Sequence, residues 1–231
     1  MMMRDDISSR ASSSSCGRAV IAVMRAMRVI PRCAREERLA RVDARNVVVG
    51  DAPRSETVRA RGLGRGAFGV VLRRARGRDG SWDALVTRRS MMKDVWPGAL
   101  DAVTSGACLG GEEYAETMRR ELAEELGEDA ARGARVEMLF TFPYEDRYMR
   151  VWGGCFEVTL RDDAEVVCAD GEVAAAAFEP LDALAESLRE GREEFTPVGK
   201  YALERYLAFK ASGGRELPPQ TWSERHVEAS G

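Results

Sequence analysis

The amino-acid sequence predicts one mixed α/β domain between about residues 39 and 211. Short β-branched or apolar segments bounded by glycine alternate in this region with longer segments of helical periodicity. Apolar residues make up 45% of the chain and charged residues 32%, which is the composition of a globular protein. No stretch holds 18 uncharged apolar residues, so we expect no membrane-spanning helix and no membrane partner.

Six strands and three helices are expected. The strands are apolar or β-branched runs at residues 47–49, 67–72, 83–87, 136–142, 151–160 and 173–178. The helices have apolar residues at spacings of three and four, at residues 113–126, 181–189 and 198–210. Thr196 followed by Pro197 is a start signal for the last helix. The glycine-rich run 62–66 resembles a phosphate-binding loop, but no helix signal follows it, so we interpret it as a turn.

The two ends of the chain differ in composition from this domain. Through Arg35 there are seven arginines, no lysine or glutamate, and only two aspartates, in a serine-rich segment of amphipathic pattern. This is typical of a transit peptide, so residues 1–38 are expected to form either a plastid or mitochondrial targeting segment or a disordered leader of a cytoplasmic protein. Residues 212–231 are polar and contain Pro218 and Pro219, and we expect a mobile tail.

The cysteine and histidine counts restrict the chemistry. The five cysteines are scattered and form no C-x-x-C pair, which favours free thiols in a reducing compartment over a disulfide framework or a zinc site. His226 is the only histidine, so histidine-based triads and metal sites are disfavoured. We therefore expect any catalysis to depend on carboxylates.

An acidic cluster on the helix expected at 113–126 is the strongest candidate site. Glu121, Glu124 and Glu125 are three and four residues apart, so their side chains project within an arc of about 100°. One interpretation is a solvated acidic face. The other is a site for Mg²⁺, a hard cation that prefers oxygen ligands and would remove the repulsion between the carboxylates. Met118, Leu122 and Leu126 follow at four-residue spacing and would pack the helix against a sheet.

The spacing of the surrounding residues resembles the signature of the Nudix hydrolases. Gly106 is followed by Glu112, by the triplet 120–122 (Arg-Glu-Leu), by Glu124-Glu125 and by Gly127 at the spacing of that family, and only Glu128 departs, where an aliphatic residue is usual. Flanking segments over residues 41–209 look like the branch related to isopentenyl-diphosphate isomerase, although Gly64 stands where relatives often have histidine. The resemblance implies a Nudix fold, with a mixed β-sheet sandwiched between helices in an α/β/α arrangement.

The resemblance also implies a mechanism. Glu121, Glu124 and Glu125, with the carbonyl of Gly106, would hold Mg²⁺ or Mn²⁺, and water activated by the metal would attack a diphosphate linkage. Arg120 would form a steadying ion pair with Glu112. Glu121 or Glu172 would accept the proton of the water, although Arg120 and the metal should keep the pKa of Glu121 low. Candidate substrate-binding residues are Trp96, Trp152 and Arg88. Further arginines that could reach substrate phosphates are Arg89, Arg147 and Arg150.

Two other functions are retained. The first is a noncatalytic Nudix module that binds a ligand or a protein, because fold alone does not determine function. Isopentenyl-diphosphate isomerase activity is less favoured, since the metal site of that enzyme uses several histidines. We expect a small diphosphate substrate, derived from a nucleoside diphosphate or a related metabolite, no nucleic-acid polymer as partner, and a homodimer as a further possibility.

Overall fold

The computed structural model describes residues 36–215, except residues 78–79, 94, 169–170 and 192. The expected leader therefore lies almost entirely outside the described residues, as does the tail beyond Arg215, and both remain predictions. Ser212, at the start of that tail, closes the last helix, because its hydroxyl donates to the carbonyl of Phe209 at 2.7 Å. Within the described part of the chain no helix is long and apolar enough to cross a membrane.

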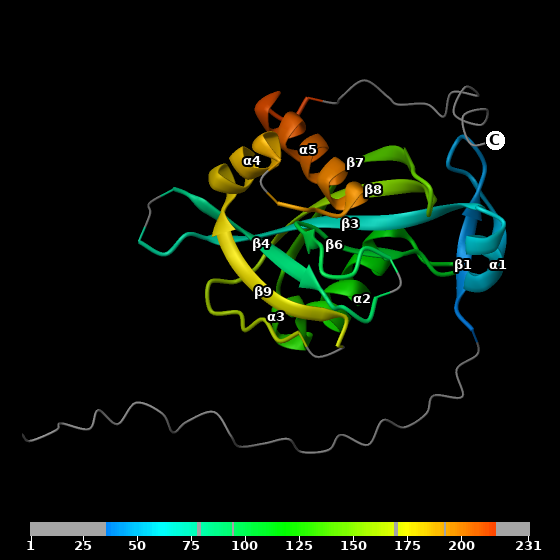
Figure 1. Ribbon diagram of the computed structural model, residues 1–231, viewed down its shortest axis with the longest axis horizontal. Helices are drawn as coiled ribbons and strands as arrows, with labels where there is room; N and C mark the ends of the chain where they lie inside the picture. Colours follow the sequence, from blue (N-terminus) through cyan, green and yellow to red (C-terminus); the bar gives the residue numbers. More distant parts are fainter. Residues whose placement is uncertain (1–35, 78–79, 94, 169–170, 192, 216–231) are drawn as a thin grey trace, which may run out of the picture. The chain divides into compact units, whose positions relative to one another are not determined.

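Within the described residues, nine strands form one mixed sheet (Figure 1). In chain order they are β1 (Arg38–Val42), β2 (Val48–Pro53), β3 (Leu63–Arg74), β4 (Trp82–Arg89), β5 (Leu100–Asp101), β6 (Thr104–Ala107), β7 (Arg135–Glu145), β8 (Arg150–Thr159) and β9 (Val173–Pro180).

The long strand β3 organises the sheet. Along one edge it pairs in parallel with β8, from Leu63 opposite Arg150 to Leu72 opposite Thr159. Along its other edge it pairs antiparallel with β1, β6 and β4 in turn. The outer strands are added by antiparallel pairing of β2 with β1, of β7 with β8, and of β5 and β9 with β4.

Helices cover both faces of this sheet. The helices are α1 (Arg54–Arg59), α2 (Tyr114–Leu126), α3 (Glu128–Ala131), α4 (Leu181–Glu190) and α5 (Pro197–Ala211). Because side chains alternate along a strand, Phe68 and Val70 of β3 pack in the core beneath α4 and α5, whereas Ala67 and Val71 pack in the core beneath α2. The expected α/β/α arrangement is therefore confirmed, and Figure 1 shows α4 and α5 on the opposite side of the sheet from α2.

The predicted strands and helices all occur, and five short elements were not predicted. These are β1, α1, β5, β6 and α3, which are two to six residues long and carry little periodic signal. The interpretation of residues 62–66 as a turn is wrong, because β3 already begins at Leu63. Glycine is needed in this strand since neighbouring strands approach closely: a Cβ on Gly66 would lie 3.2 Å from both the carbonyl oxygen of Gly106 and a methyl of Val151.

Candidate active site

Helix α2 is fixed to the sheet by its apolar face. Met118, Leu122 and Leu126 are completely buried in the core shared with β3 and β8. The fit is close at Met118, because a Cβ on Gly69 of β3 would lie 2.6 Å from the Met118 sulfur. The helix begins at a capping box in which the side chains of Glu113 and Glu116 each accept a hydrogen bond from the other residue's backbone N–H. Its acidic side chains are thereby carried on a rigid support.

Arg120 connects α2 to the loop that precedes it. Its Nε donates to Glu112 Oε1 at 2.9 Å and its Nη2 to Glu112 Oε2 at 3.1 Å, a two-point contact between planar groups. Nη2 also donates to the carbonyl of Ala107 at 3.1 Å. Glu112 accepts two further hydrogen bonds, from the Leu109 amide at 3.0 Å and the Thr117 hydroxyl at 2.8 Å. The structure therefore contains the ion pair expected between Arg120 and Glu112, and it closes the loop against the helix.

The hydrogen bonds of this pair control its charge state. Burial alone would raise the pKa of Glu112, but hydrogen bonds from Arg120, the Leu109 amide and Thr117 outweigh burial and lower that pKa. The hydrogen bond to Glu112 in turn raises the pKa of Arg120 above its usual range. Both side chains are therefore charged at neutral pH, as a structural ion pair requires.

Glu121 is the most enclosed carboxylate of the acidic cluster. Its side chain is 13% exposed, and its Oε1 accepts a hydrogen bond from Arg120 Nη1 at 2.6 Å. It lies directly against Gly106 of β6, where a Cβ would overlap the carboxylate. Burial raises the pKa of Glu121, while Arg120 opposes this shift. Burial therefore outweighs Arg120 in the metal-free protein, whereas the expectation of a low pKa also included the charge of a bound metal.

Glu124 and Glu125 point to different surroundings. Glu124 is 56% exposed and accepts a hydrogen bond from Arg120 Nη1 at 3.2 Å. Glu125 lines a small pocket between α2 and the sheet. As the side chains stand, no group of three acidic, cysteine or histidine residues in the described ranges is arranged to hold a metal ion. The donor set nevertheless suits a hard divalent cation, since it offers three carboxylates on one helix and a glycine cradle that leaves Glu121 room.

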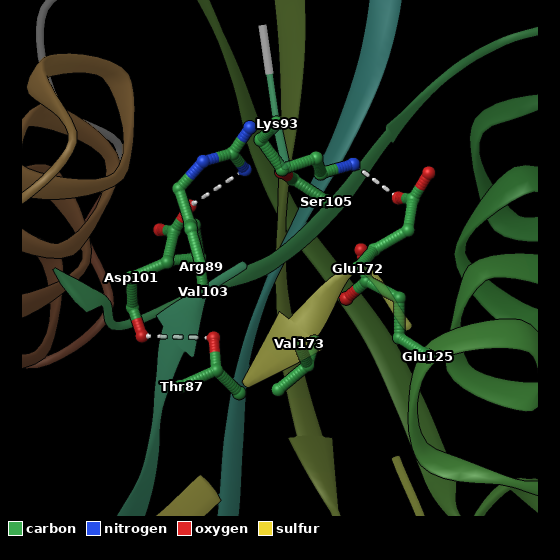
Figure 2. Close-up of a pocket in the computed structure, with 9 residues that line it drawn as sticks. All are labelled: Thr87, Arg89, Lys93, Asp101, Val103, Ser105, Glu125, Glu172 and Val173. Atoms are coloured by element: carbon green, nitrogen blue, oxygen red, sulfur yellow. Dashed lines mark hydrogen bonds and ion pairs between the residues drawn. The ribbon is translucent and has the colours of Figure 1, made fainter. Parts of the chain in front are cut away.

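The pocket brings acidic and basic side chains from several elements together (Figure 2). Arg89 ends β4, Lys93 lies in the loop after it, and Glu172 immediately precedes β9. Figure 2 shows Glu125 and Glu172 reaching toward the pocket from one side, with Arg89 and Asp101 on the other. The described residues that line it are Thr87, Arg89, Lys93, Asp101, Val103, Ser105, Glu125, Glu172 and Val173.

Glu172 is held in place at this pocket. Its carboxylate forms an ion pair with Lys93, and its backbone carbonyl accepts a hydrogen bond from the Ser90 amide at 2.8 Å. Its side chain is 53% exposed. The structure thus places Glu172 beside Glu125, although the two residues are 47 positions apart in the chain.

Comparison with known proteins identifies the family. Residues 64–198, more than half of the chain, match the family described as the NUDIX domain. The chain belongs to the Nudix family. The motif spacing from Gly106 to Gly127, the fold, and the ion pair between Arg120 and Glu112 all agree with this assignment.

The curated relatives are uncharacterized members of the same family. An uncharacterized Nudix hydrolase of Streptomyces coelicolor is 36% identical over 174 residues, covering 75% of this chain and 90% of the relative. One from Yersinia pestis is 37% identical over 115 residues, and there this chain spans only 58% of the relative's length. These relatives are named as Nudix hydrolases and not as isopentenyl-diphosphate isomerases, so the assignment holds at the level of the family.

A solved structure supports the fold. The crystal structure of DR0079 from Deinococcus radiodurans superposes with a TM-score of 0.57 at 23% sequence identity. The match covers 73% of this chain and 98% of that protein.

The three expected substrate-binding residues of this Nudix domain lie outside the pocket lining. Arg88 donates from Nη1 to the carbonyl of Gly98 at 2.8 Å, and its neighbour Arg89 occupies the pocket instead. Adjacent strand residues point to opposite faces, and Arg89 shares the pocket face of β4 with Thr87, two residues earlier. Trp152 is only 8% exposed, and Trp96 packs edge to face against Tyr148 at 5.8 Å between ring centres.

Lys93 and Asp101 are pocket residues that the sequence argument did not identify as functional. Their signal was weak because each is a single charged residue in a chain that is 32% charged. The sequence carried no further signal for Asp101, because its two-residue strand β5 exists only through pairing with β4, where Thr87, another pocket residue, lies opposite it.

Replacing Gly106 with alanine is expected to lower kcat by about 10²-fold while the protein stays folded. The new methyl group overlaps the Glu121 carboxylate, and displacing a catalytic group by about 1 Å has an effect of this size. The overlapping atoms are the flexible end of a side chain, so the melting temperature should change little. Gly64→Ala is the matched control, since its Cβ would make only an ordinary 3.4 Å contact with the carbonyl of Ala40. Equal turnover in both variants would contradict the importance of this contact.

Proposed function

We propose that this Nudix domain hydrolyses a diphosphate linkage in a small metabolite, with Mg²⁺ or Mn²⁺ bound by Glu121, Glu124 and Glu125 and by the carbonyl of Gly106. The observation that carries the proposal is the pocket beside α2. It presents Glu125 of the acidic cluster together with two cations, Arg89 and Lys93. A diphosphate substrate that binds with a metal ion requires both kinds of group, a carboxylate for the metal and cations for the phosphates.

The side chains of the pocket divide into two groups by their chemistry. The guanidinium of Arg89 and the ammonium of Lys93 would bind phosphate oxygens and orient the anhydride bond. The divalent metal, when bound, neutralises phosphate charge and makes a water molecule a better nucleophile. Arg120 keeps the helix and its loop in register through Glu112 and is assigned a supporting role at the catalytic carboxylates.

The reaction needs one proton acceptor. The oxygen of water forms a bond to one phosphorus atom, the bridging P–O bond breaks, and the second phosphate departs with the bonding electrons. Glu172 is the proposed acceptor of the proton of the water, because it lines the pocket opposite Arg89 and lies beside Glu125. Glu121 is the alternative acceptor, since burial raises its pKa and so makes it a stronger base than an exposed glutamate.

The residues that line the pocket do not distinguish one class of diphosphate substrate from another. A nucleoside diphosphate linked to another group, a dinucleotide polyphosphate and a nonnucleotide diphosphate all carry the linkage that these residues would act upon. The similarity of the flanking segments to the isopentenyl-diphosphate-isomerase branch supports including nonnucleotide diphosphates, whereas the single histidine of the chain disfavours isomerisation itself.

An assay of phosphate or nucleotide release from a panel of diphosphates tests the proposal. With Mg²⁺ or Mn²⁺ we expect turnover of at least one substrate, and we expect EDTA to abolish it and added metal to restore it. Tight, metal-dependent binding of a panel member without any turnover would instead favour the noncatalytic Nudix module. If the protein neither turned over nor bound any member of the panel, that result would contradict both functions.

A further inference from the structure

Asp101 is a buried acid beside the pocket that the proposed mechanism does not use. The residue is 6% exposed and ends the short strand β5. Its Oδ2 lies 4.0 Å from Nη1 of Arg89, and Figure 2 shows the two side chains together at one side of the pocket. Its Oδ1 is buried without a hydrogen-bond partner among the described residues. A buried carboxylate in this state is costly and calls for a reason.

The carboxylate is confined on its other side by α5. A Cβ on Gly199, in the first turn of this 15-residue helix, would overlap Asp101 Oδ1. The hydroxyl of Thr196 accepts a hydrogen bond from the Gly199 amide at 3.2 Å and so fixes that turn. Asp101 therefore has little freedom to move away from Arg89.

Arg89 is also held at a second point. Its Nε and Nη2 donate to the carbonyl of Val95 at 3.2 and 3.0 Å, respectively. The carbonyl and the Asp101 carboxylate thus constrain different nitrogens of one guanidinium, whose side chain is 23% exposed. Five N–H donors are available on an arginine, so donors remain for a ligand in the pocket.

We propose that Asp101 is a positioning residue, whose buried carboxylate holds the Arg89 guanidinium in the orientation that binds a substrate phosphate. This inference rests on the proposed function, because it assigns Arg89 to phosphate binding. Asp101 acts through Arg89 and does not contact the substrate.

The energetics of Asp101 support a functional reason for an acid here. Burial raises the pKa of Asp101 to about 6, although the positive charge of Arg89 opposes the shift. A folded pKa above the unfolded value means that the stabilising contribution is complete at low pH and is lost as the pH rises through about 6. The ionised Asp101 therefore destabilises the fold at neutral pH. Among the residues that the structure describes, the other charged groups that line the pocket are Lys93, Glu125 and Glu172.

The test measures the affinity of the full chain for inorganic pyrophosphate, by calorimetry and by inhibition of turnover. For Asp101→Asn at pH 7.5 we expect about tenfold weaker pyrophosphate binding and an increase in KM of similar size, with kcat little changed. The melting temperature should be equal to or above that of the unchanged protein. At pH 5 the difference in affinity between the unchanged protein and Asp101→Asn should shrink, since Asp101 is then mostly protonated and is uncharged like asparagine.

A double-variant comparison shows whether Asp101 acts through Arg89. Arg89→Gln should weaken pyrophosphate binding, and adding Asp101→Asn to it should weaken binding no further. Gly199→Ala is a second variant that displaces the same carboxylate while keeping its charge, and it should also raise KM.

The outcomes separate this inference from the proposed function. Normal pyrophosphate affinity in Asp101→Asn together with weakened affinity in Arg89→Gln would overturn the role of Asp101 and leave the proposed function standing. Additive losses in the double variant would also overturn it. Normal affinity in both single variants would show that Arg89 does not bind phosphate, and would remove the basis of both proposals.

Discussion

Glu125→Gln is expected to lower kcat by at least about 10²-fold, and Glu124→Gln by a similar factor, without unfolding the protein. Glutamine has nearly the shape of glutamate but lacks the charge that a divalent metal requires. Neither side chain belongs to the buried apolar face of α2, so the melting temperature should be preserved. Turnover of the best substrate at saturating Mg²⁺, together with the thermal unfolding curve, checks both expectations.

Glu128→Gln is the matched control for this experiment. Glu128 follows the acidic cluster by three residues, is exposed, and lies at the start of α3 outside the pocket lining. The same loss of charge there should leave kcat unchanged. If Glu124→Gln and Glu125→Gln both retained the rate of Glu128→Gln, the acidic cluster would not be the metal site.

Glu172→Gln is expected to lower kcat by about 10² to 10⁴-fold with nearly unchanged metal affinity, which is the size expected for loss of a general base. The position at the pocket edge, beside Glu125 and in contact with Lys93, supports this role. Glu121→Gln should differ, because it should weaken metal binding itself. Turnover as a function of Mg²⁺ concentration distinguishes the two variants.

The ion pair with Lys93 offers a competing explanation that a second variant excludes. If Glu172 only orients Lys93, then Lys93→Met should reproduce the effect of Glu172→Gln, and both should act mainly on KM. If Glu172 is the base, Lys93→Met should raise KM while Glu172→Gln lowers kcat. Near-normal turnover of Glu172→Gln at saturating metal would return the role of base to Glu121.

Helices could be predicted from the sequence, because their signals are local, whereas short strands that depend on long-range pairing could not. The helix 113–126 was predicted within one residue of α2, because apolar spacing and capping residues act within a few positions of one another. The same holds for α5, whose N-terminal Thr196 and Pro197 occur as expected. Strands shorter than five residues, such as β5 and β6, were missed since they exist only through pairing with β4 and β3.

The burial of individual carboxylates was the second feature that the sequence did not predict. Burial raises the pKa of Glu121, whose carboxylate lies against Gly106 of β6, although its chain neighbour Arg120 opposes this shift. The raised pKa of Asp101 likewise depends on α5, which begins almost 100 positions later. Burial of a charge is set by elements that come together only on folding.

The sequence by itself determined the Nudix family motif, the acidic face of α2, and the apolar face that mounts it, because all three depend on residue spacings within the short segment from Gly106 to Gly127. Only the tertiary structure decided what faces that helix. Four charged residues around the pocket come from separate parts of the chain: Arg89 from β4, Lys93 from the loop after it, Asp101 from β5 and Glu172 from the position before β9. Sheet pairing brings them together. Folding also decided which face of β4 borders the pocket, and Arg89 lies on that face with Thr87, whereas Arg88 lies on the other.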